Sequence, residues 1–245
     1  MKQVSCTVCG ADNAAPLYGK RGYTLVRCLS CGLGYLNPQP EPPELALHYQ
    51  GEYGNVYVHS EKKIRSKLWD ARREMFRISR MCKARERSLL DVGASFGYMV
   101  KVAADSGWKA LGVDPSLHAA AWARENFGVT VLQGDIFSVN VPEGSLSAVT
   151  MFDVLEHTFD PQENLNRACA LLAPGGLLVL GVPDFGHPKA RKMGPDWPHF
   201  NPPEHLYYFD FDTLDTLCRR AGFSLSRKFF RFPNRDTLKV AYRKD

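Results

Sequence analysis

The amino-acid sequence predicts an α/β protein: a Rossmann-like, doubly wound and mostly parallel sheet that closes with a C-terminal antiparallel hairpin, behind a small N-terminal module. Three observations carry this prediction. Apolar strand-like runs alternate with helical patterns from Ser88 onward, which is typical of parallel strands joined by crossover helices. A glycine-containing turn follows the first of these runs. Two cysteine pairs stand near the N-terminus.

The stretch from Ser88 to Val100 organises the rest of the chain. It reads as a buried strand, a tight turn and the start of a helix. Gly93 and Gly97 let the backbone turn sharply and approach a ligand closely. Asp91 stands near the carboxyl end of the strand, where open α/β sheets bind ligands. The turn is not G-x-G-x-x-G, which suits a cofactor without a pyrophosphate.

Three further motifs follow in order, and together they carry a family resemblance. Asp114 ends the next strand, where an acidic residue can accept both hydroxyls of a ribose. With Asp91-x-Gly93-x-x-x-Gly97, it resembles the first motif and the ribose-binding acid of class I S-adenosylmethionine-dependent methyltransferases. Gly134–Phe137 resembles their adenine loop, and Leu171–Gly176 resembles the turn before their fifth strand. The resemblance covers about two thirds of the chain.

The resemblance implies S-adenosyl-L-methionine as the cofactor. The residues it implies for cofactor binding lie in the turns after four strands: Asp91, Gly93, Ala94, Ser95, Gly97, Asp114, Asp135, Ile136 and Phe152. The chain departs from the family pattern at Ala94-Ser95-Phe96, where relatives more often have Cys, Gly or Thr. The departure concerns contacts with the methionine end of the cofactor.

Composition sets the general class. The chain has 245 residues, 44% hydrophobic content and a formal charge of +5, which does not by itself imply nucleic acid. No apolar run reaches the roughly 20 residues that span a bilayer, and the N-terminus has no signal-peptide pattern. We therefore expect a cytoplasmic protein without a membrane segment, whose clustered cysteines bind metal rather than form disulfides.

Residues 1–36 are predicted to form a zinc ribbon. Two C-x-x-C pairs, each followed by glycine, would supply four thiolates for a closed tetrahedral site: Cys6, Cys9, Cys28 and Cys31. Four cysteines leave no open position, so a structural zinc is favoured over a catalytic one. So short a segment cannot bury enough apolar surface to fold without its metal.

Residues 37–87 are predicted to be a proline-rich linker and a basic amphipathic helix over 60–87. The helix carries eleven basic and four acidic residues, a net +7. A solvated face is the simpler interpretation; a docking surface for phosphate, from a nucleotide-linked substrate or from RNA, is the alternative. Tyr53, in the aromatic stretch before the helix, either covers a seam between modules or closes over the cofactor.

Residues 88–245 are predicted to be the methyltransferase domain. After the first strand we expect strands at 110–114, 129–132, 148–152 and 177–182, and helices at 98–104, 116–127, 162–172 and 213–221. Residues 223–232 and 236–242 are expected to form the closing hairpin.

Glu156 and His157 are candidate catalytic residues because they follow the strand predicted to lie beside the first one. A neutral imidazole can take a proton from a hydroxyl, which is a poor nucleophile until that proton leaves. Glu156 could orient the imidazole. The alternative is that the pair caps the next helix and shapes the site without proton transfer.

The loop from Pro183 to Pro203 and the segment after it are the candidate substrate region. Long loops inside compact domains are usually functional. His205 begins a stretch that resembles a segment of small-molecule methyltransferases, where this histidine faces the substrate, so it is the second candidate base. The predicted substrate contacts are Tyr53, Trp197, His199 and Tyr207. A metal site built from His199, Glu204 and His205 matches no known zinc spacing.

These observations predict a methyltransferase that acts on a small polar metabolite, by O-methylation of a sugar or natural-product hydroxyl. The substrate could be nucleotide-linked or phosphorylated. One rival is an RNA methyltransferase that holds RNA with the ribbon and the basic helix, although nucleic acid is disfavoured: the tetrad typical of amino-group methylation is replaced by Phe152-Asp153-Val154-Leu155. A second rival is a non-catalytic adaptor that only binds the cofactor. The sequence does not indicate an oligomeric state.

Overall fold

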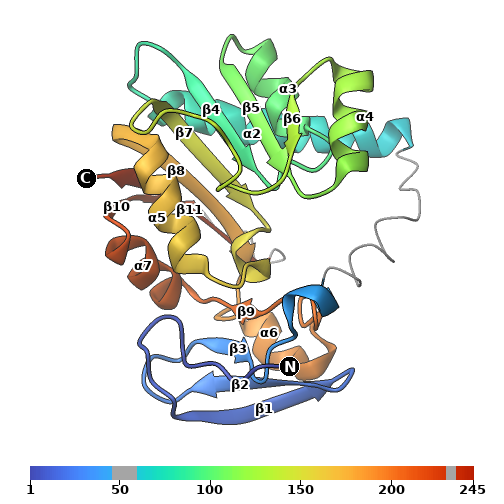
Figure 1. The fold of residues 1–245 in the computed structure, drawn as a ribbon, viewed down its shortest axis with the longest axis vertical. Coiled ribbons are helices and arrows are strands. Elements are labelled where there is room, and N and C mark those ends of the chain that lie inside the picture. The colour runs from blue at the N-terminus through green and yellow to red at the C-terminus, as the bar shows by residue number, and fades with distance from the viewer. Residues whose placement is uncertain (46–59, 230–235) are drawn as a thin grey trace.

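The fold contains two sheets, a large one in the upper part of the molecule and a small one below it (Figure 1). The computed structural model describes residues 1–45, 60–229 and 236–245. No helix in these described ranges is long and apolar enough to cross a membrane. Tyr53 lies outside the described residues.

The large sheet has seven strands in the order β10-β11-β8-β7-β4-β5-β6. Among its described strands, β11 is the one that runs antiparallel to its neighbours, which confirms the predicted, mostly parallel sheet with a terminal hairpin. The strands are β4 (Ser88–Val92), β5 (Lys109–Asp114), β6 (Val131–Gln133), β7 (Leu146–Phe152), β8 (Leu172–Pro183), β10 (Phe223–Lys228) and β11 (Thr237–Lys244).

Helices cover both faces of the large sheet, as a doubly wound fold requires. One face packs against α2 (Glu61–Met81), α3 (Tyr98–Asp105) and α4 (Leu117–Phe127). The other packs against α5 (Pro161–Leu171) and α7 (Phe211–Arg220). The chain leaves β4 toward β5 on one side and reaches β7 on the other, so a crevice for ligands is expected where β4 and β7 end.

Helix α2 is shorter than the sequence predicts. Its Ser60 cap accepts a hydrogen bond from the Lys63 amide, but the helix ends at Met81 rather than at Arg87. The backbone after it bonds to the sheet instead: Glu86 O accepts from the Ser147 hydroxyl and Arg87 O accepts from the Lys109 amide. Basic side chains at 83–87 therefore lie on a connecting segment.

Strand β8 begins five residues before its predicted start at Leu177. Leu172 pairs with Leu146 across an irregularity in the sheet, so the Pro174-Gly175-Gly176 turn is part of the strand's first half. Gly175 adopts φ +71°, which glycine tolerates best. Strand β10 ends at Lys228, and residues 230–232 of its predicted range lie outside the described residues.

The small sheet contains the segment predicted to be a zinc ribbon, called the ribbon below, and it is not built from the N-terminal segment alone. Strands β1 (Ala14–Lys20), β2 (Tyr23–Cys28) and β3 (Gly34–Leu36) are joined by β9 (Tyr207–Tyr208), which comes from far along the chain. Figure 1 shows β9 between the two sheets. The segment that precedes β9 is not one long loop, since it contains α6 (Pro188–Met193) and a 3-10 turn (Gly194–Asp196).

Candidate active site

The turn after β4 is held against the end of β5. The Ser95 amide donates to Asp114 Oδ2 at 2.7 Å and the Ser116 amide donates to Asp114 Oδ1 at 2.9 Å. Ser95 itself has φ +47°, an uncommon backbone state for a residue with a side chain. Gly93 has φ +68°, and a Cβ there would lie 2.5 Å from Val154 Cγ2. The turn therefore lies directly against the segment that follows β7.

Two acidic side chains lie beneath this turn. Asp91 is 5% exposed and accepts a hydrogen bond of 2.6 Å from the Thr150 hydroxyl. Burial and then the nearby Asp114 carboxylate raise the pKa of Asp91 to about 7, against the Thr150 hydrogen bond. Burial likewise raises the pKa of Asp114, while the two amides that bond to it act in the opposite direction. Both sites favour a ligand that brings hydrogen-bond donors.

The other residues predicted to contact the cofactor lie around the same strand ends. Asp135 is exposed, and its Oδ1 accepts from the amides of Phe137 and Ser138, so it also shapes its own turn. Ile136 is fully buried in the apolar core. Phe152 is half-buried, with the Lys239 ammonium 5.1 Å from its ring centroid. Their contacts with a cofactor stay predictions.

A histidine cluster forms next to the cofactor turn. A 3-10 turn, Leu155–His157, follows β7 and places Glu156 in the interior with 1% of its surface exposed. The Leu206 amide donates to Glu156 O at 2.7 Å, which brings His205 alongside. The His157 and His205 rings are 4.6 Å apart and nearly perpendicular. One ligand atom from each of Glu156, His157 and His205 lies within 4.8 Å of the others.

Burial keeps the two histidines of this cluster neutral. It lowers the pKa of His157 to about 4, although a hydrogen bond to the Glu204 main chain acts in the opposite direction. It lowers the pKa of His205 to about 3, and His157 and His199 lower it further. Burial, and then the Asp153 carboxylate, raise the pKa of Glu156 well above its ordinary value. The two imidazoles are therefore neutral at physiological pH, and burial favours the protonated form of the Glu156 carboxyl group.

The residues predicted to contact the substrate divide into two groups. Trp197 is 1% exposed, and its indole donates to Asp236 Oδ2 at 2.7 Å; Tyr207 is 4% exposed, and its hydroxyl donates to Phe159 O at 3.0 Å. Both side chains lie in the interior, and their contacts with a substrate stay predictions. His199 is one-third exposed and stacks 6.5 Å from His205, so it belongs beside the cluster.

Sequence reasoning missed two acidic residues of this region. Asp153 follows β7 and has φ +55°. Its side chain is open to solvent on one side. The protein that surrounds its other sides raises the pKa of Asp153, whereas the charges of His199 and Lys239 act in the opposite direction. Asp236 binds Lys189 Nζ at 3.2 Å and lies 3.7 Å from His199 Nε2. Asp153 stands at a strand's carboxyl end, which is a usable signal; Asp236 has no such signal, because its partners are distant in sequence.

The metal set considered from His199, Glu204 and His205 is not the one that the structure gathers. Glu156 and His157 take the places of Glu204 and His199 beside His205.

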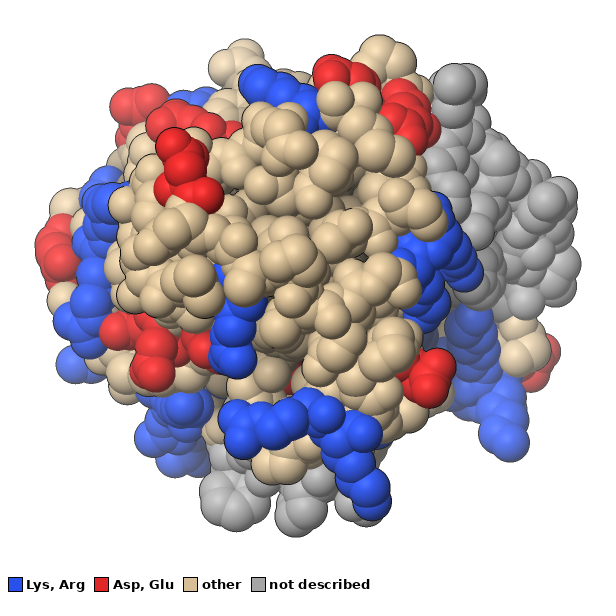
Figure 2. Space-filling view, turned by 90° about the horizontal axis from the view of Figure 1, so that it is seen from below, with Lys and Arg blue, Asp and Glu red and all other residues tan. Residues whose placement is uncertain are grey.

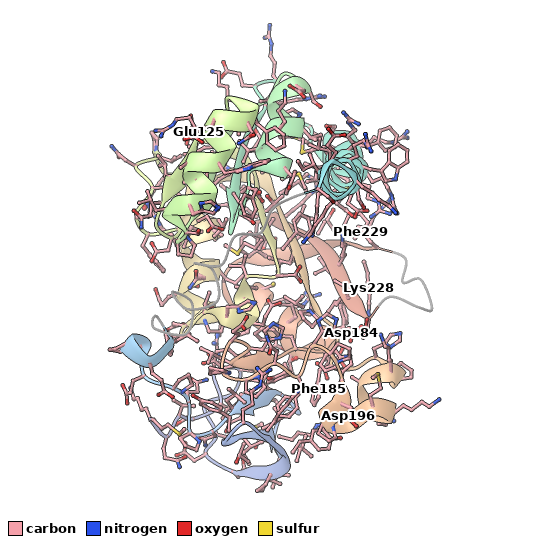
Figure 3. The ribbon with its side chains drawn as sticks, turned by 90° about the vertical axis from the view of Figure 1, so that its right-hand side faces the viewer. Glu125, Asp184, Phe185, Asp196, Lys228 and Phe229 are labelled. Atoms are coloured by element: carbon pink, nitrogen blue, oxygen red, sulfur yellow. The ribbon has the colours of Figure 1, made fainter. Side chains whose placement is uncertain are left out.

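Figure 3 labels Asp184 and Phe185, which lie where the chain leaves the large sheet toward the ribbon. The Asp184 amide donates to Asp236 O at 2.8 Å, which joins the residue after β8 to the residue before β11.

The four N-terminal cysteines come together as the sequence predicts. Their sulfur atoms lie within 4.8 Å of one another, with Cys6 Sγ 3.4 Å from Cys31 Sγ and Cys9 Sγ 3.5 Å from Cys28 Sγ. A zinc ion with bonds of about 2.3 Å would hold its sulfurs about 3.8 Å apart, so this cradle fits one closely. Burial raises the pKa of the Cys28 thiol, but the amides of Cys31 and Ser30 outweigh it and bring it to about 7.

Known proteins share this fold and parts of the sequence. One similar structure is the 1,6-didemethyltoxoflavin-N1-methyltransferase of Burkholderia thailandensis with bound 1,6-didemethyltoxoflavin and S-adenosylhomocysteine. Its TM-score is 0.62 at 17% identity, and the match covers 94% of this chain and 99% of that chain. A probable S-adenosylmethionine-dependent methyltransferase of Mycolicibacterium smegmatis is 26% identical over 64% of this chain and 60% of its own. The C-methyltransferase NovU of Streptomyces niveus is 26% identical over 89% of this chain and 55% of its own.

The sheet order and the carboxylate-lined turn define a class I S-adenosylmethionine-dependent methyltransferase fold, with S-adenosylmethionine as the supported cofactor. Residues 61–227 match the profile of the methyltransferase domain family, and the chain belongs to that family. It spans about half the length of the curated relatives it matches: 28% of the first and 60% of the second.

The position of Asp114 yields a test of the cofactor site. Asp114→Ala should weaken S-adenosylmethionine binding about 10- to 100-fold, because hydrogen bonds to a charged group contribute roughly 1.5–3 kcal/mol. Isothermal titration calorimetry measures the affinity. Asp105→Ala, a change at an exposed helix end, should leave it unchanged. Equal affinities in the two variants would remove Asp114 from the site.

Proposed function

We propose that this protein transfers a methyl group from S-adenosylmethionine to a small polar metabolite, on an atom that must first lose a proton. One observation carries the proposal: neutral imidazoles of His157 and His205 adjoin the turn that the cofactor residues form. The small-molecule substrate of the B. thailandensis neighbour is compatible with this class of acceptor.

Different residues of the chain would have different roles in such a reaction. When bound, S-adenosylmethionine supplies an electrophilic methyl group on a sulfonium. Asp91 and Asp114 would hold the donor molecule by its amino and ribose groups, and the glycine turn would fix its orientation. A ring nitrogen of His157 or His205 would accept the acceptor's proton while the acceptor atom bonds to the methyl carbon and the carbon–sulfur bond breaks, which leaves S-adenosylhomocysteine. Glu156 holds the pair in place from its buried position.

The first candidate chemistry is O-methylation of a sugar or natural-product hydroxyl. An alcohol needs its proton removed during attack, and a buried imidazole can do this without first losing a proton itself. The open polar wall formed by Asp153 and His199 suits a hydroxylated ligand. A nucleotide-linked or phosphorylated acceptor would add contacts with basic groups such as Lys67, whose charge reaches Asp153.

C-methylation is the second candidate, and one relative favours it. The match to NovU, which is named a C-methyltransferase, extends over 89% of this chain. A carbon next to a carbonyl becomes a nucleophile once it loses a proton, so the same histidine pair would serve. The two reactions differ in the acceptor rather than in the base.

An RNA acceptor is less well supported. On the face at the ribbon end, which Figure 2 shows, lysine and arginine side chains lie mainly around the margin, interspersed with acidic ones, and form no continuous basic track. Nucleic-acid binding uses a continuous basic track. RNA retention that disappears with salt would nevertheless revive this alternative.

A structural zinc ion is proposed for the cysteine cradle. The donor set is four thiols in two C-x-x-C pairs, with sulfur spacings near those of a zinc tetrahedron. Glycines after each pair carry the tight turns, and the amides of Gly10 and Gly32 donate to Cys6 O and Cys28 O. The ion would hold the sheet on which β9 depends.

Removal of either imidazole tests the base. His157→Ala and His205→Ala should lower turnover about 10²- to 10⁴-fold while cofactor affinity stays within a small factor. Because the neutral form is active and burial lowers both pKa values, the acid limb of the pH–rate profile should appear only near pH 4. Stopped assays from pH 4 to 8 measure it. Near-normal turnover in both variants would leave alignment alone to explain catalysis.

The atom that receives the methyl group is read from the product. With ¹³C-methyl-labelled S-adenosylmethionine and candidate acceptors, the carbon chemical shift of the new methyl group separates an O-methyl from a C-methyl product. Exchange of an acceptor C–H in D₂O without cofactor would accompany C-methylation only. An O-methyl resonance with no such exchange is the outcome expected from the first candidate.

The zinc proposal predicts one thiolate-bound ion per chain. A mercurial thiol reagent should release one zinc ion per chain to a colorimetric indicator, since the reagent attacks the four cysteines. Cys28→Ser should abolish the release, whereas Cys169→Ser, which changes a cysteine outside the cradle, should preserve it. Purified protein that yields no zinc under this treatment would contradict the ribbon assignment.

A further inference from the structure

Three side chains of the histidine cluster converge on a common point. Glu156 and His157 come from the 3-10 turn after β7, and His205 comes from the segment that leads into β9. One ligand atom from each lies within 4.8 Å of the other two. Two imidazole nitrogens and a carboxylate oxygen are ligands that divalent transition metals accept readily.

Each imidazole of the cluster also has a hydrogen bond to the main chain. The His157 ring donates to the main-chain oxygen of Glu204, and the His205 ring donates to that of His199. His205 Nδ1 has no hydrogen-bond partner in the described part of the chain. Outer hydrogen bonds of this kind fix the tautomer and ring orientation of metal-binding histidines.

Glu156 supplies the second, independent observation. It is 1% exposed, and within the described residues neither of its carboxylate oxygens has a hydrogen-bond partner. A carboxyl group so placed is costly to bury unless a proton or a cation accompanies it. Both of its oxygens are thus available to an ion between the three side chains.

We propose that Glu156, His157 and His205 form a second metal site, separate from the cysteine cradle, for one divalent transition-metal ion such as Zn²⁺ or Co²⁺. Bonds of about 2.0–2.2 Å would draw the three side chains inward by rotamer adjustment. Three ligands leave a position open for water, on the side where His157 is half-buried rather than fully enclosed. The absence of sulfur distinguishes this site chemically from the ribbon.

Metal binding would compete with methyl transfer. An ion takes the same nitrogen lone pairs that the proposed reaction uses to accept a proton, so the occupied site cannot act as the base. This consequence rests on the proposed function, whereas the binding itself does not. The enzyme would then be inhibited by free zinc and restored by a chelator too weak to strip the ribbon.

Cobalt titration of the zinc-loaded full chain tests the site directly. Added Co²⁺ should bind one ion per chain and give visible d–d absorption without the near-ultraviolet thiolate charge transfer that a cysteine site produces. Glu156→Gln and His205→Ala should each weaken binding at least about tenfold, since each removes or neutralises one ligand. His118→Ala removes a histidine on α4 outside the cluster and should bind as the wild type does.

Several results would overturn the proposal. The wild type could take up no cobalt beyond the ribbon, or the spectrum could show only thiolate bands. Both ligand variants, each checked for native circular dichroism, could also bind cobalt with wild-type affinity. In the wild type, binding should weaken as the pH falls, because protons compete for the ligands; affinity independent of pH would count against the site.

The activity arm separates this inference from the proposed function. Turnover of the wild type should fall as cobalt fills the site, at unchanged cofactor affinity. Bound cobalt with undiminished turnover would overturn the competition. Failure of cobalt to bind would overturn the metal site and would leave the proposal of a histidine base untouched. Loss of turnover in His205→Ala, assayed without added metal, would still support that base.

Discussion

The main chain of Leu206 connects the three parts on which the site depends. Its amide donates to Glu156 O at 2.7 Å and its carbonyl accepts from the Leu36 amide at 2.9 Å. One residue thus joins the end of β7, the segment that carries His205 and the last strand of the ribbon. Leu206 is itself fully buried, so water does not compete for either bond. Loss of the ribbon would therefore disturb the histidine cluster through Leu206.

This connection explains why the ribbon can matter to chemistry without a catalytic metal. Strand β9 adds Tyr207 and Tyr208 to the edge of β3, and the same short segment places His205 against His157. Lys20 and Arg21, in the β1–β2 hairpin, donate to main-chain oxygens of Phe200 and Pro202. The ribbon therefore holds in place the segment that contains Phe200 and Pro202. A metal ion in the ribbon would stabilise that segment indirectly.

The sequence contained enough to predict the fold but only part of the site. Periodicity located the strands of the large sheet, because buried parallel strands read as apolar runs; it overextended α2, since the main-chain oxygens of Glu86 and Arg87 bond to the sheet. The Asp91 and Asp114 turns were readable because they follow strands directly. Trp197 and Tyr207 were predicted to contact substrate, yet they lie in the interior, and the role of Asp236 depends on contacts across β8 and α6 that no local pattern encodes.

The titratable groups of the histidine cluster lower the stability of the folded protein both as the pH falls and as the pH rises. The unfolded chain protonates its histidines near pH 6.5, whereas burial lowers the folded pKa values of His157 and His205; below pH 6.5 the unfolded state binds more protons and stability falls. Glu156 acts in the opposite sense. Its folded pKa is raised above the ordinary 4.5, so above pH 4.5 the unfolded state binds fewer protons and stability falls as the pH rises.

No pH therefore satisfies all three groups at once, and the surrounding core must hold them together. A ligand that supplies donors or positive charge to the cluster removes part of this cost, and by linkage it stabilises the folded protein as it binds. The polar groups that make the site costly in the free protein are thus the same ones that would give an acceptor, or a cation, its affinity. These groups lie after the end of β7 and beside Leu206, in a part of the fold where Glu156 and Leu206 are buried.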